Sequence, residues 1–333
     1  MPTGPAAALP EGLADPELAA WVAEVRREPG EPVGSIGSAR LREAARRRAA
    51  DRPRGPELAV VKDLCTDNGI ALRLYRPTLR PAPMVVFLHG GGFVIGDLDT
   101  HDGICRHLAA DARAAVVAVD HRRAPEHPGP AAVDDAVDAV SWTRAHLVNL
   151  GGLSDAGVAL AGDSSGGAVA VLAASRLRET ETSPSALLLA YPNVDMTLSM
   201  PSVEGKGHGW GLDSEGLRWF VDQWLGESGR GDDPRLSPWH ADLSGLPPTI
   251  IATAEHDPLR DEGDALAARL GELGVPVHHL PHAGLVHGFL GLGHVSPTAA
   301  LAGHALFARF GDLLRELSGP ARGQAATKTA SSV

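Results

Sequence analysis

The sequence predicts an α/β fold in which a mostly parallel sheet of eight strands carries helices on both faces. Short apolar runs alternate with segments of helical periodicity along most of the 333 residues, which is the pattern of strand–helix–strand units. Such units place successive strands in parallel through crossover helices. Hydrophobic residues make up 44% of the chain, enough for one large buried core. We therefore expect a single α/β domain with added helical segments.

Composition and charge exclude several classes of protein. The formal net charge is −11, so a general attraction to nucleic acid or to anionic membranes is not expected. No run of 18 apolar residues is present, and the start, Met1–Pro5, lacks the cationic and apolar parts of a signal peptide. We expect a cytoplasmic protein. Cys65 and Cys105 are too few for a disulfide framework or a zinc site, and we interpret both as small buried hydrophobes.

We expect residues 1–54 to form a helical segment separate from the rest of the chain. Asp15 is a candidate N-cap with Pro16 at the first helical position, and one apolar face comes next, made of Leu18, Trp21, Val22 and Val25. A Gly/Pro-rich break covers residues 28–37, and Ser38 begins a second helix. The arginines of this helix (Arg42, Arg46, Arg47 and Arg48) allow an anionic partner, but we favour a solvated face.

The period becomes strand-like from Leu58. Residues 58–65 and 70–75 flank Asn68-Gly69, which predicts an antiparallel hairpin at the sheet edge. Six further strands are expected at 84–88, 115–119, 158–161, 186–190, 249–254 and 275–280. Helix faces lie between and after them, made of Val133, Val137, Val140 and Leu147, then Leu259, Leu266, Leu270 and Leu273, and finally Leu306, Phe310, Leu313 and Leu317.

One long segment interrupts the alternation. About 57 residues separate the strand ending at Tyr191 from the one starting at Thr249, far more than a crossover needs. Asp213 begins an amphipathic helix there, and we interpret residues 196–228 as a cap insertion that covers the site together with residues 1–54. Its aromatic residues either line a substrate pocket or pack the helix on the core: Trp210, Trp219, Phe220 and Trp224. The catalytic domain then spans residues 55–318, and residues 319–333 are expected to be a disordered tail.

The strongest chemical signal is Gly162-x-Ser164-x-Gly166 between an apolar strand and an alanine-rich helix. This pattern in this setting is typical of a nucleophile elbow, a sharp turn that lifts a serine hydroxyl above the sheet. Glycines two positions on either side are needed because the turn leaves no space for side chains. We therefore predict that Ser164 is a nucleophile.

A nucleophilic serine needs a histidine base and an acid that orients it. Asp257 follows the strand at 249–254, at the edge where α/β sites are built, whereas Asp261 lies where the next helix begins. Candidate bases near and after the final strand are His278, His279, His282, His287 and His294. The first two fall within the strand pattern, and no neighbouring carboxylate makes the cluster a metal site. Spacing favours His287 over His282 without deciding between them.

The third requirement is a set of donors for an oxyanion. His89-Gly90-Gly91-Gly92 follows the strand at 84–88, the place from which one wall of such a hole is supplied. We expect the N–H groups of Gly91 and Gly92 to donate, with that of Ser165 across the pocket, while His89 and Gly90 position the loop. The run lacks the Gly-Lys-Ser/Thr ending of a phosphate-binding loop.

With these pieces assembled, the chain resembles the hormone-sensitive-lipase-like family of α/β hydrolases, chiefly its bacterial carboxylesterases. The resemblance covers about residues 58–315 and rests on four motifs in order: His89-Gly90-Gly91-Gly92-Phe93, Gly162-Asp163-Ser164-Ser165-Gly166-Gly167, Asp257-Pro258-Leu259-Arg260-Asp261-Glu262-Gly263 and His287-Gly288-Phe289. It implies an α/β-hydrolase fold with a helical cap. It also implies Ser164 as nucleophile, Asp257 as acid and His287 as base, with Gly91, Gly92 and Ser165 as oxyanion donors.

Three positions depart from the family pattern. Ser165 replaces the more usual alanine after the nucleophile, His121-Arg122-Arg123 stands where Tyr-Arg-Leu is common, and Gly129 stands where an aromatic often lies. These departures put loop packing in question and leave the catalytic residues in place.

The expected function is a serine carboxylesterase that hydrolyses short- to medium-chain acyl esters through an acyl-enzyme. The alternatives are an amidase, a deacetylase or an acyl transferase on a specific metabolite, or a non-catalytic small-molecule receptor. The expected partner is a small-molecule ester, without cofactor, metal, nucleic acid or membrane. The sequence is compatible with a homodimer and does not decide the oligomeric state.

Overall fold

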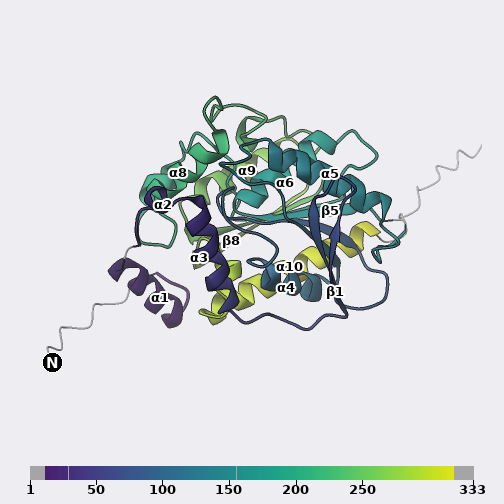
Figure 1. Ribbon diagram of the computed structural model, residues 1–333, viewed down its shortest axis with the longest axis horizontal. Coiled ribbons are helices and arrows are strands. Elements are labelled where there is room, and N and C mark those ends of the chain that lie inside the picture. Colours follow the sequence, from purple (N-terminus) through teal and green to yellow (C-terminus); the bar gives the residue numbers. More distant parts are fainter. Residues whose placement is uncertain (1–11, 29, 155, 319–333) are drawn as a thin grey trace, which may run out of the picture.

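The computed structural model describes residues 12–28, 30–154 and 156–318 and contains one eight-stranded sheet (Figure 1). The strand order is β1-β2-β4-β3-β5-β6-β7-β8. The strands are β1 (Val60–Cys65), β2 (Ala71–Arg76), β3 (Met84–Leu88), β4 (Ala115–Val119), β5 (Val158–Asp163), β6 (Leu187–Ala190), β7 (Thr249–His256) and β8 (Val277–Val286). All eight predicted strands are present.

Strand pairing confirms the mostly parallel sheet. β2 runs antiparallel to both β1 and β4, and every other neighbouring pair from β4 to β8 is parallel. The predicted hairpin forms the edge, where Gly69 turns with a φ of 86° between β1 and β2. The carboxyl ends of β3, β5, β7 and β8 therefore meet at one edge of the sheet, which is where functional loops gather in α/β folds.

Two helical layers bury the sheet. The helices that cover the sheet are α4 (Asp102–Ala112), α5 (Ala131–Ala145), α6 (Ser165–Leu177), α9 (Arg260–Glu272) and α10 (Pro297–Ser318). α4 and α10 lie on one side of the sheet, and α5, α6 and α9 lie on the other (Figure 1). Strand β3 shows the consequence, since Val86 packs into one core and Val85 into the other. Burial on both faces explains its continuous apolar run.

The N-terminal segment contains α1 (Pro16–Arg27), α2 (Val33–Ile36) and α3 (Ser38–Ala50). Asp15 caps α1 as expected, because its Oδ1 accepts from the N–H of Leu18 at 2.8 Å. Its Oδ2 accepts from the N–H of Thr298 at 3.0 Å, which joins the segment to the start of α10. The break predicted between the two helices is not wholly irregular, because α2 forms within it and packs against α8 (Ser214–Leu225).

The arginine face of α3 is solvated only in part, because Arg46, Arg47 and Arg48 are exposed as expected whereas the side chain of Arg42 is 18% exposed. Arg42 donates from Nε to the carbonyl of Val94 and from Nη2 to that of Ala124, both at 2.8 Å. The same guanidinium forms a bidentate pair with Glu126. Arg46 pairs with Asp97 at 2.6 Å. Helical periodicity predicts which residues share a face of a helix. It does not predict which loops, distant in sequence, pack against that face.

The long insertion before β7 contains α7 (Pro201–Gly205) and α8. Two short 3₁₀ turns also occur, η1 (Pro238–His240) before β7 and η2 (Phe289–Gly291) after β8. The expected amphipathic helix is α8, with Leu217, Val221 and Trp224 buried. The tail expected at 319–333 lies outside the described residues. Within the ranges that the structure covers, no helix is long and apolar enough to cross a membrane.

Three expectations need correction. The final strand runs on to Val286 and not to Leu280, because β8 continues to pair with β7 as far as His256. Many side chains of this edge strand are exposed and polar. They interrupt the apolar pattern from which the length of a strand is predicted. Cys65 is exposed at the edge of the sheet, whereas Cys105 is buried as predicted. Leu273 and Leu317 are 44% and 45% exposed and do not belong to the core faces.

Candidate active site

Ser164 occupies the turn between β5 and α6 in a strained conformation, with φ 53° and ψ −123°. This backbone conformation is unfavourable for a residue other than glycine, so contacts with the surrounding structure must maintain it. A Cβ at Gly162 would lie 2.4 Å from the carbonyl oxygen of Gly166, and a Cβ at Gly166 would lie 2.1 Å from that of Leu88. Both flanking positions therefore require glycine, as the motif indicated.

The structure brings Ser164, His287 and Asp257 together in one hydrogen-bonded chain. The Oγ of Ser164 lies 3.0 Å from Nε2 of His287, and Nδ1 of His287 lies 2.8 Å from Oδ2 of Asp257. Asp257 is fully buried. Because a carboxylate only accepts, Nδ1 carries the imidazole proton and Nε2 is left to accept from the serine hydroxyl. This is the arrangement of a nucleophile, its base and an orienting acid.

The competing candidates lie elsewhere. His282 is part of β8, where its ring packs against Phe289 at a centroid distance of 4.9 Å. His278 faces Arg309, and His279 interacts with Asp264. Asp261 accepts from the N–H of Ser202 at 2.9 Å and so connects α9 to the cap insertion. The geometry thus separates His287 from His282, which sequence spacing did not.

The glycine-rich loop after β3 faces the serine. Gly91 and Gly92 have positive φ values of 118° and 59°, which turn their peptide groups as L-residues rarely allow. Within the described part of the chain, neither N–H bonds to a backbone carbonyl. The Oγ of Ser165 accepts from the N–H of Phe93 at 3.1 Å and joins this loop to the nucleophile turn. The serine that departs from the family's alanine therefore has a structural partner.

His89 and Gly90 fix the base of the loop. The His89 ring stacks on His121 at a centroid distance of 4.0 Å, and its Nδ1–H donates to the carbonyl of Gly90 at 2.9 Å. Burial holds the pKa of His89 well below its usual value, so the ring is neutral. Asp163 accepts from the N–H of Gly90 at 2.8 Å. The role of Asp163 was not predicted from the sequence. A carboxylate in a buried motif nevertheless needs a hydrogen-bond donor, which here is the N–H of Gly90.

Tyr191 is a second residue that the sequence did not single out. It follows β6 with a φ of 38°, and its ring meets the His287 ring edge-on at a centroid distance of 4.9 Å. The same ring also meets Phe289 at a centroid distance of 5.1 Å. Burial raises the pKa of its hydroxyl well above the usual value. The Tyr191 ring therefore packs against the imidazole and limits its rotation.

Glu262 supports the acid loop from the first turn of α9. Its Oε1 accepts from Nδ2 of Asn193 at 3.0 Å and from the N–H groups of Val194 and Asp195. Complete burial nevertheless raises the pKa of Glu262 from its usual 4.5 to about 8. Its carboxyl group is thus neutral at pH 7 and connects the loop after β6 to the helix that follows Asp257.

Replacing Glu262 by glutamine should remove a pH-dependent loss of stability. The folded protein keeps the Glu262 proton up to about pH 8, whereas the unfolded chain loses it above about 4.5. The unfolded state therefore binds fewer protons in this window, and wild-type stability falls as pH rises, by at most about 1.4 kcal/mol per pH unit. Unfolding of both proteins between pH 5 and 8 tests this. The exposed Glu272→Gln variant on the same helix is the control, and parallel pH curves for wild type and Glu262→Gln would contradict the prediction.

The cap aromatics divide between packing and the site. Trp224 is buried, stacks on Phe93 at 4.3 Å and fills the space beside Gly129, where a Cβ would lie 2.7 Å from the indole. Trp210 stacks on His256 at 4.1 Å, with the Arg26 guanidinium 4.3 Å from its ring centroid. Phe220 lies over the glycine loop, since a Cβ at Gly92 would be 2.4 Å from its ring. Trp219 contacts Gly34 near α2.

A mostly parallel sheet with a serine–histidine–aspartate chain at its carboxyl edge defines an α/β hydrolase. The comparisons agree, since the family model described as alpha/beta hydrolase fold matches residues 85–291. The chain belongs to this family, as the resemblance to its hormone-sensitive-lipase-like members indicated.

Characterised relatives extend over most of the chain. The esterase LipI of Mycobacterium tuberculosis is 43% identical over 274 residues, covering 78% of this chain and 85% of that protein. An ethyl acetate hydrolase of Pseudomonas putida is 34% identical over 299 residues, 84% of this chain and 93% of the relative. The structure of an esterase from Pyrobaculum calidifontis matches with a TM-score of 0.80 at 34% identity, covering 88% of this chain and 98% of that one.

Proposed function

We propose that the protein is a serine carboxylesterase in which Ser164 is the nucleophile, His287 the general base and Asp257 the orienting acid. That it hydrolyses carboxylic esters follows from its family and from its similarity to several esterases. The observation that carries the assignment of the residues is the hydrogen-bonded chain from Ser164 through His287 to Asp257, at 3.0 and 2.8 Å.

The proposed reaction proceeds in two steps. The Oγ of Ser164 attacks the ester carbonyl while Nε2 of His287 takes the hydroxyl proton, and the same proton passes to the departing alcohol as the acyl-enzyme forms. His287 then removes a proton from water as the water attacks the acyl carbon, and it returns that proton to Oγ of Ser164 as the acyl–Oγ bond breaks and the acid leaves. Throughout, the carboxylate of Asp257 stabilises the cationic imidazole through Nδ1.

We assign the oxyanion donors to the N–H groups of Gly91, Gly92 and Ser165. Their charge stabilisation matters most when the carbonyl oxygen becomes negative, and each such donor is typically worth a factor of about 10² to 10³ in turnover. The positive φ values of the two glycines and the link from Phe93 to Ser165 support this assignment. His89, Gly90 and Asp163 would hold the loop in position.

We further propose that residues 1–54 and the insertion at 196–228 form a cap that bounds the acyl site. Support comes from the contact of α2 with α8 and from the position of Phe220 over Gly92. A relative is named for the hydrolysis of ethyl acetate, a short ester. The cytoplasmic location stays a prediction from the sequence.

Hydrolysis of a p-nitrophenyl ester series from acetate to palmitate tests the proposed substrate class. We expect kcat/KM to be highest at short to medium acyl chains and to fall toward palmitate, because Phe220 and the cap limit the space above the glycine loop. A maximum at palmitate would contradict the short-chain proposal. Labelling of Ser164 by a fluorophosphonate without turnover of any ester would instead direct the search to amides.

A further inference from the structure

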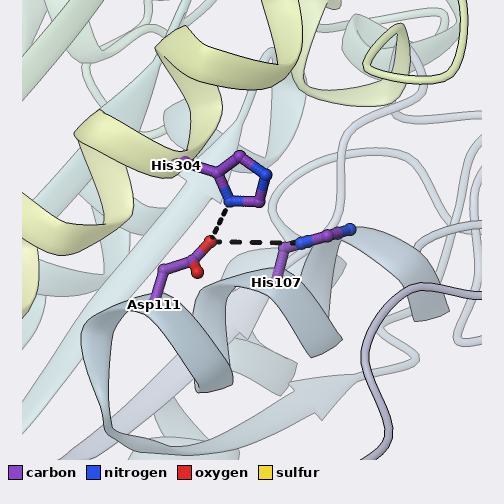
Figure 2. A group of neighbouring side chains, drawn as sticks. All are labelled: His107, Asp111 and His304. Atoms are coloured by element: carbon purple, nitrogen blue, oxygen red, sulfur yellow. Dashed lines mark hydrogen bonds and ion pairs between the residues drawn. The ribbon is translucent and has the colours of Figure 1, made fainter.

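A cluster of three potential metal ligands lies where α4 meets α10, apart from the residues assigned to hydrolysis (Figure 2). His107 and Asp111 lie one helical turn apart on α4, and His304 approaches from α10. Oδ2 of Asp111 is 2.7 Å from Nδ1 of His304 and 4.0 Å from Nδ1 of His107. One ligand atom from each of the three residues lies within 4.8 Å of the other two.

The cluster is accessible to an ion from solution. The side chains of His107, Asp111 and His304 are 40%, 24% and 46% exposed. Both histidines also line a cavity of about 460 Å³ that extends between the end of α3, the start of α4 and α10. An ion bound to the three side chains would therefore have space beside it for a water molecule.

The two imidazoles are suited to coordination. They meet nearly edge-to-face, with a centroid distance of 5.0 Å and an interplanar angle of 74°, so they do not stack on each other. The Nε2 edge of His107 packs near Gly55, which leaves Nδ1 on the side of Asp111. The imidazole nitrogens therefore lie on the same side as the carboxylate of Asp111, which is the arrangement that a shared ion requires.

The helices that carry the cluster are held in fixed positions. A Cβ at Gly311 would lie 2.4 Å from the carbonyl oxygen of Ala112, so α4 and α10 touch backbone to backbone close to Asp111. Arg315 donates to the same carbonyl at 3.3 Å. Metal–ligand bonds of about 2.0–2.2 Å require ligand atoms roughly 3–3.5 Å apart. The distance from Asp111 to His107 is 4.0 Å and the distance from Asp111 to His304 is 2.7 Å, so both lie within about 1 Å of this spacing.

We propose that His107, Asp111 and His304 bind one divalent transition-metal ion of the zinc class and thereby connect α4 to α10. Two imidazoles and one carboxylate select zinc, cobalt or nickel over magnesium and calcium, which prefer oxygen ligands. Three protein ligands leave a fourth position that faces the cavity. The net charge of −11 attracts cations to the protein. The site is independent of the proposed hydrolysis, and its role is to stabilise this side of the fold.

The test measures binding of ZnCl₂ to the full chain, prepared without a polyhistidine tag and stripped of metal with EDTA. Titration calorimetry should give one site, and thermal unfolding should shift upward by about 5 °C at a hundredfold excess over Kd. His107→Ala and His304→Ala should each weaken binding at least about tenfold, since even changes around a metal site cost about 10–100-fold. MgCl₂ should produce no shift.

The matched control is His208→Ala, because His208 is an exposed histidine of the cap insertion outside the cluster. It should bind zinc as the wild type does. Asp111→Asn keeps the shape of the side chain and should also lose affinity, which covers the case in which an alanine variant fails to fold. Circular dichroism in EDTA identifies such a failure. Equal zinc affinity in wild type, His304→Ala and Asp111→Asn would overturn the proposal, as would the absence of a stoichiometric site.

Discussion

Replacing Ser164 by alanine is expected to lower kcat for ester hydrolysis by a factor of about 10⁶, as for other enzymes with this constellation. Without the hydroxyl, no acyl-enzyme forms, and His287 has no proton to accept at Nε2. The glycine loop and the cap remain, so the variant should still bind substrate with a KM or Kd close to that of the wild type. Hydrolysis of p-nitrophenyl acetate, followed with purified variant at high enzyme concentration, measures the loss.

The control for this experiment is Ser175→Ala, on the same helix as the nucleophile turn. The hydroxyl of Ser175 donates to the carbonyl of Asp242 and has no part in the serine–histidine chain. This variant should keep most of the activity and should still react with a fluorophosphonate, whereas Ser164→Ala should not be labelled. Turnover retained in Ser164→Ala would refute the assignment of the nucleophile.

Replacing Asp257 by asparagine is expected to lower kcat by a factor of about 10⁴ while leaving the fold intact. Oδ1 of Asp257 accepts from the N–H of Leu259 and Oδ2 from Nδ1 of His287, both at 2.8 Å. In asparagine the oxygen stays with Leu259, because that N–H needs an acceptor, and the amide NH₂ then faces His287. The imidazole must accept at Nδ1 and carry its proton on Nε2. It can no longer take the proton of Ser164.

Asp261→Asn provides the comparison, because Asp261 was the alternative to Asp257 as the acid that orients the histidine. Asp261 pairs with Arg260 and accepts from Ser202, so its loss should affect the contact between cap and core far more than the chemistry. Steady-state kinetics of both variants on one short ester decide between them. If kcat fell strongly in Asp261→Asn and stayed close to the wild-type value in Asp257→Asn, the acid would be assigned to the wrong residue.

The fold could be predicted, and candidates for the reacting residues could be named, because each depends on a local pattern. Ser164, Asp257 and the glycine loop directly follow buried parallel strands, and continuous apolar runs reveal such strands. His287 was harder to place, because β8 lies at the edge of the sheet and alternates exposed with partly buried residues. Its true end at Val286 puts His282 inside the strand and His287 just beyond it.

The residues that support the site could not be predicted, because their partners are distant in sequence. Asp163 accepts a hydrogen bond from Gly90, which lies 73 residues earlier in the chain. Glu262 accepts one from Asn193, which lies 69 residues earlier. The hydrophobic periodicity of the sequence is local and does not predict hydrogen bonds between residues so far apart. The short helix α2 was missed for another reason, since four residues are too few to show a helical repeat. Tyr191 resembles any other apolar residue at the end of a strand.

The contacts of Arg42 have a consequence for how the enzyme loses activity on heating. A single guanidinium from α3 holds the carbonyl of Val94, two residues beyond Gly92, together with Ala124 and Glu126. Detachment of α1, α2 and α3 from the body of the protein would release the glycine loop after β3 while the sheet is still intact. Thermal inactivation should therefore begin below the melting temperature of the whole molecule, at the temperature where the N-terminal helices detach.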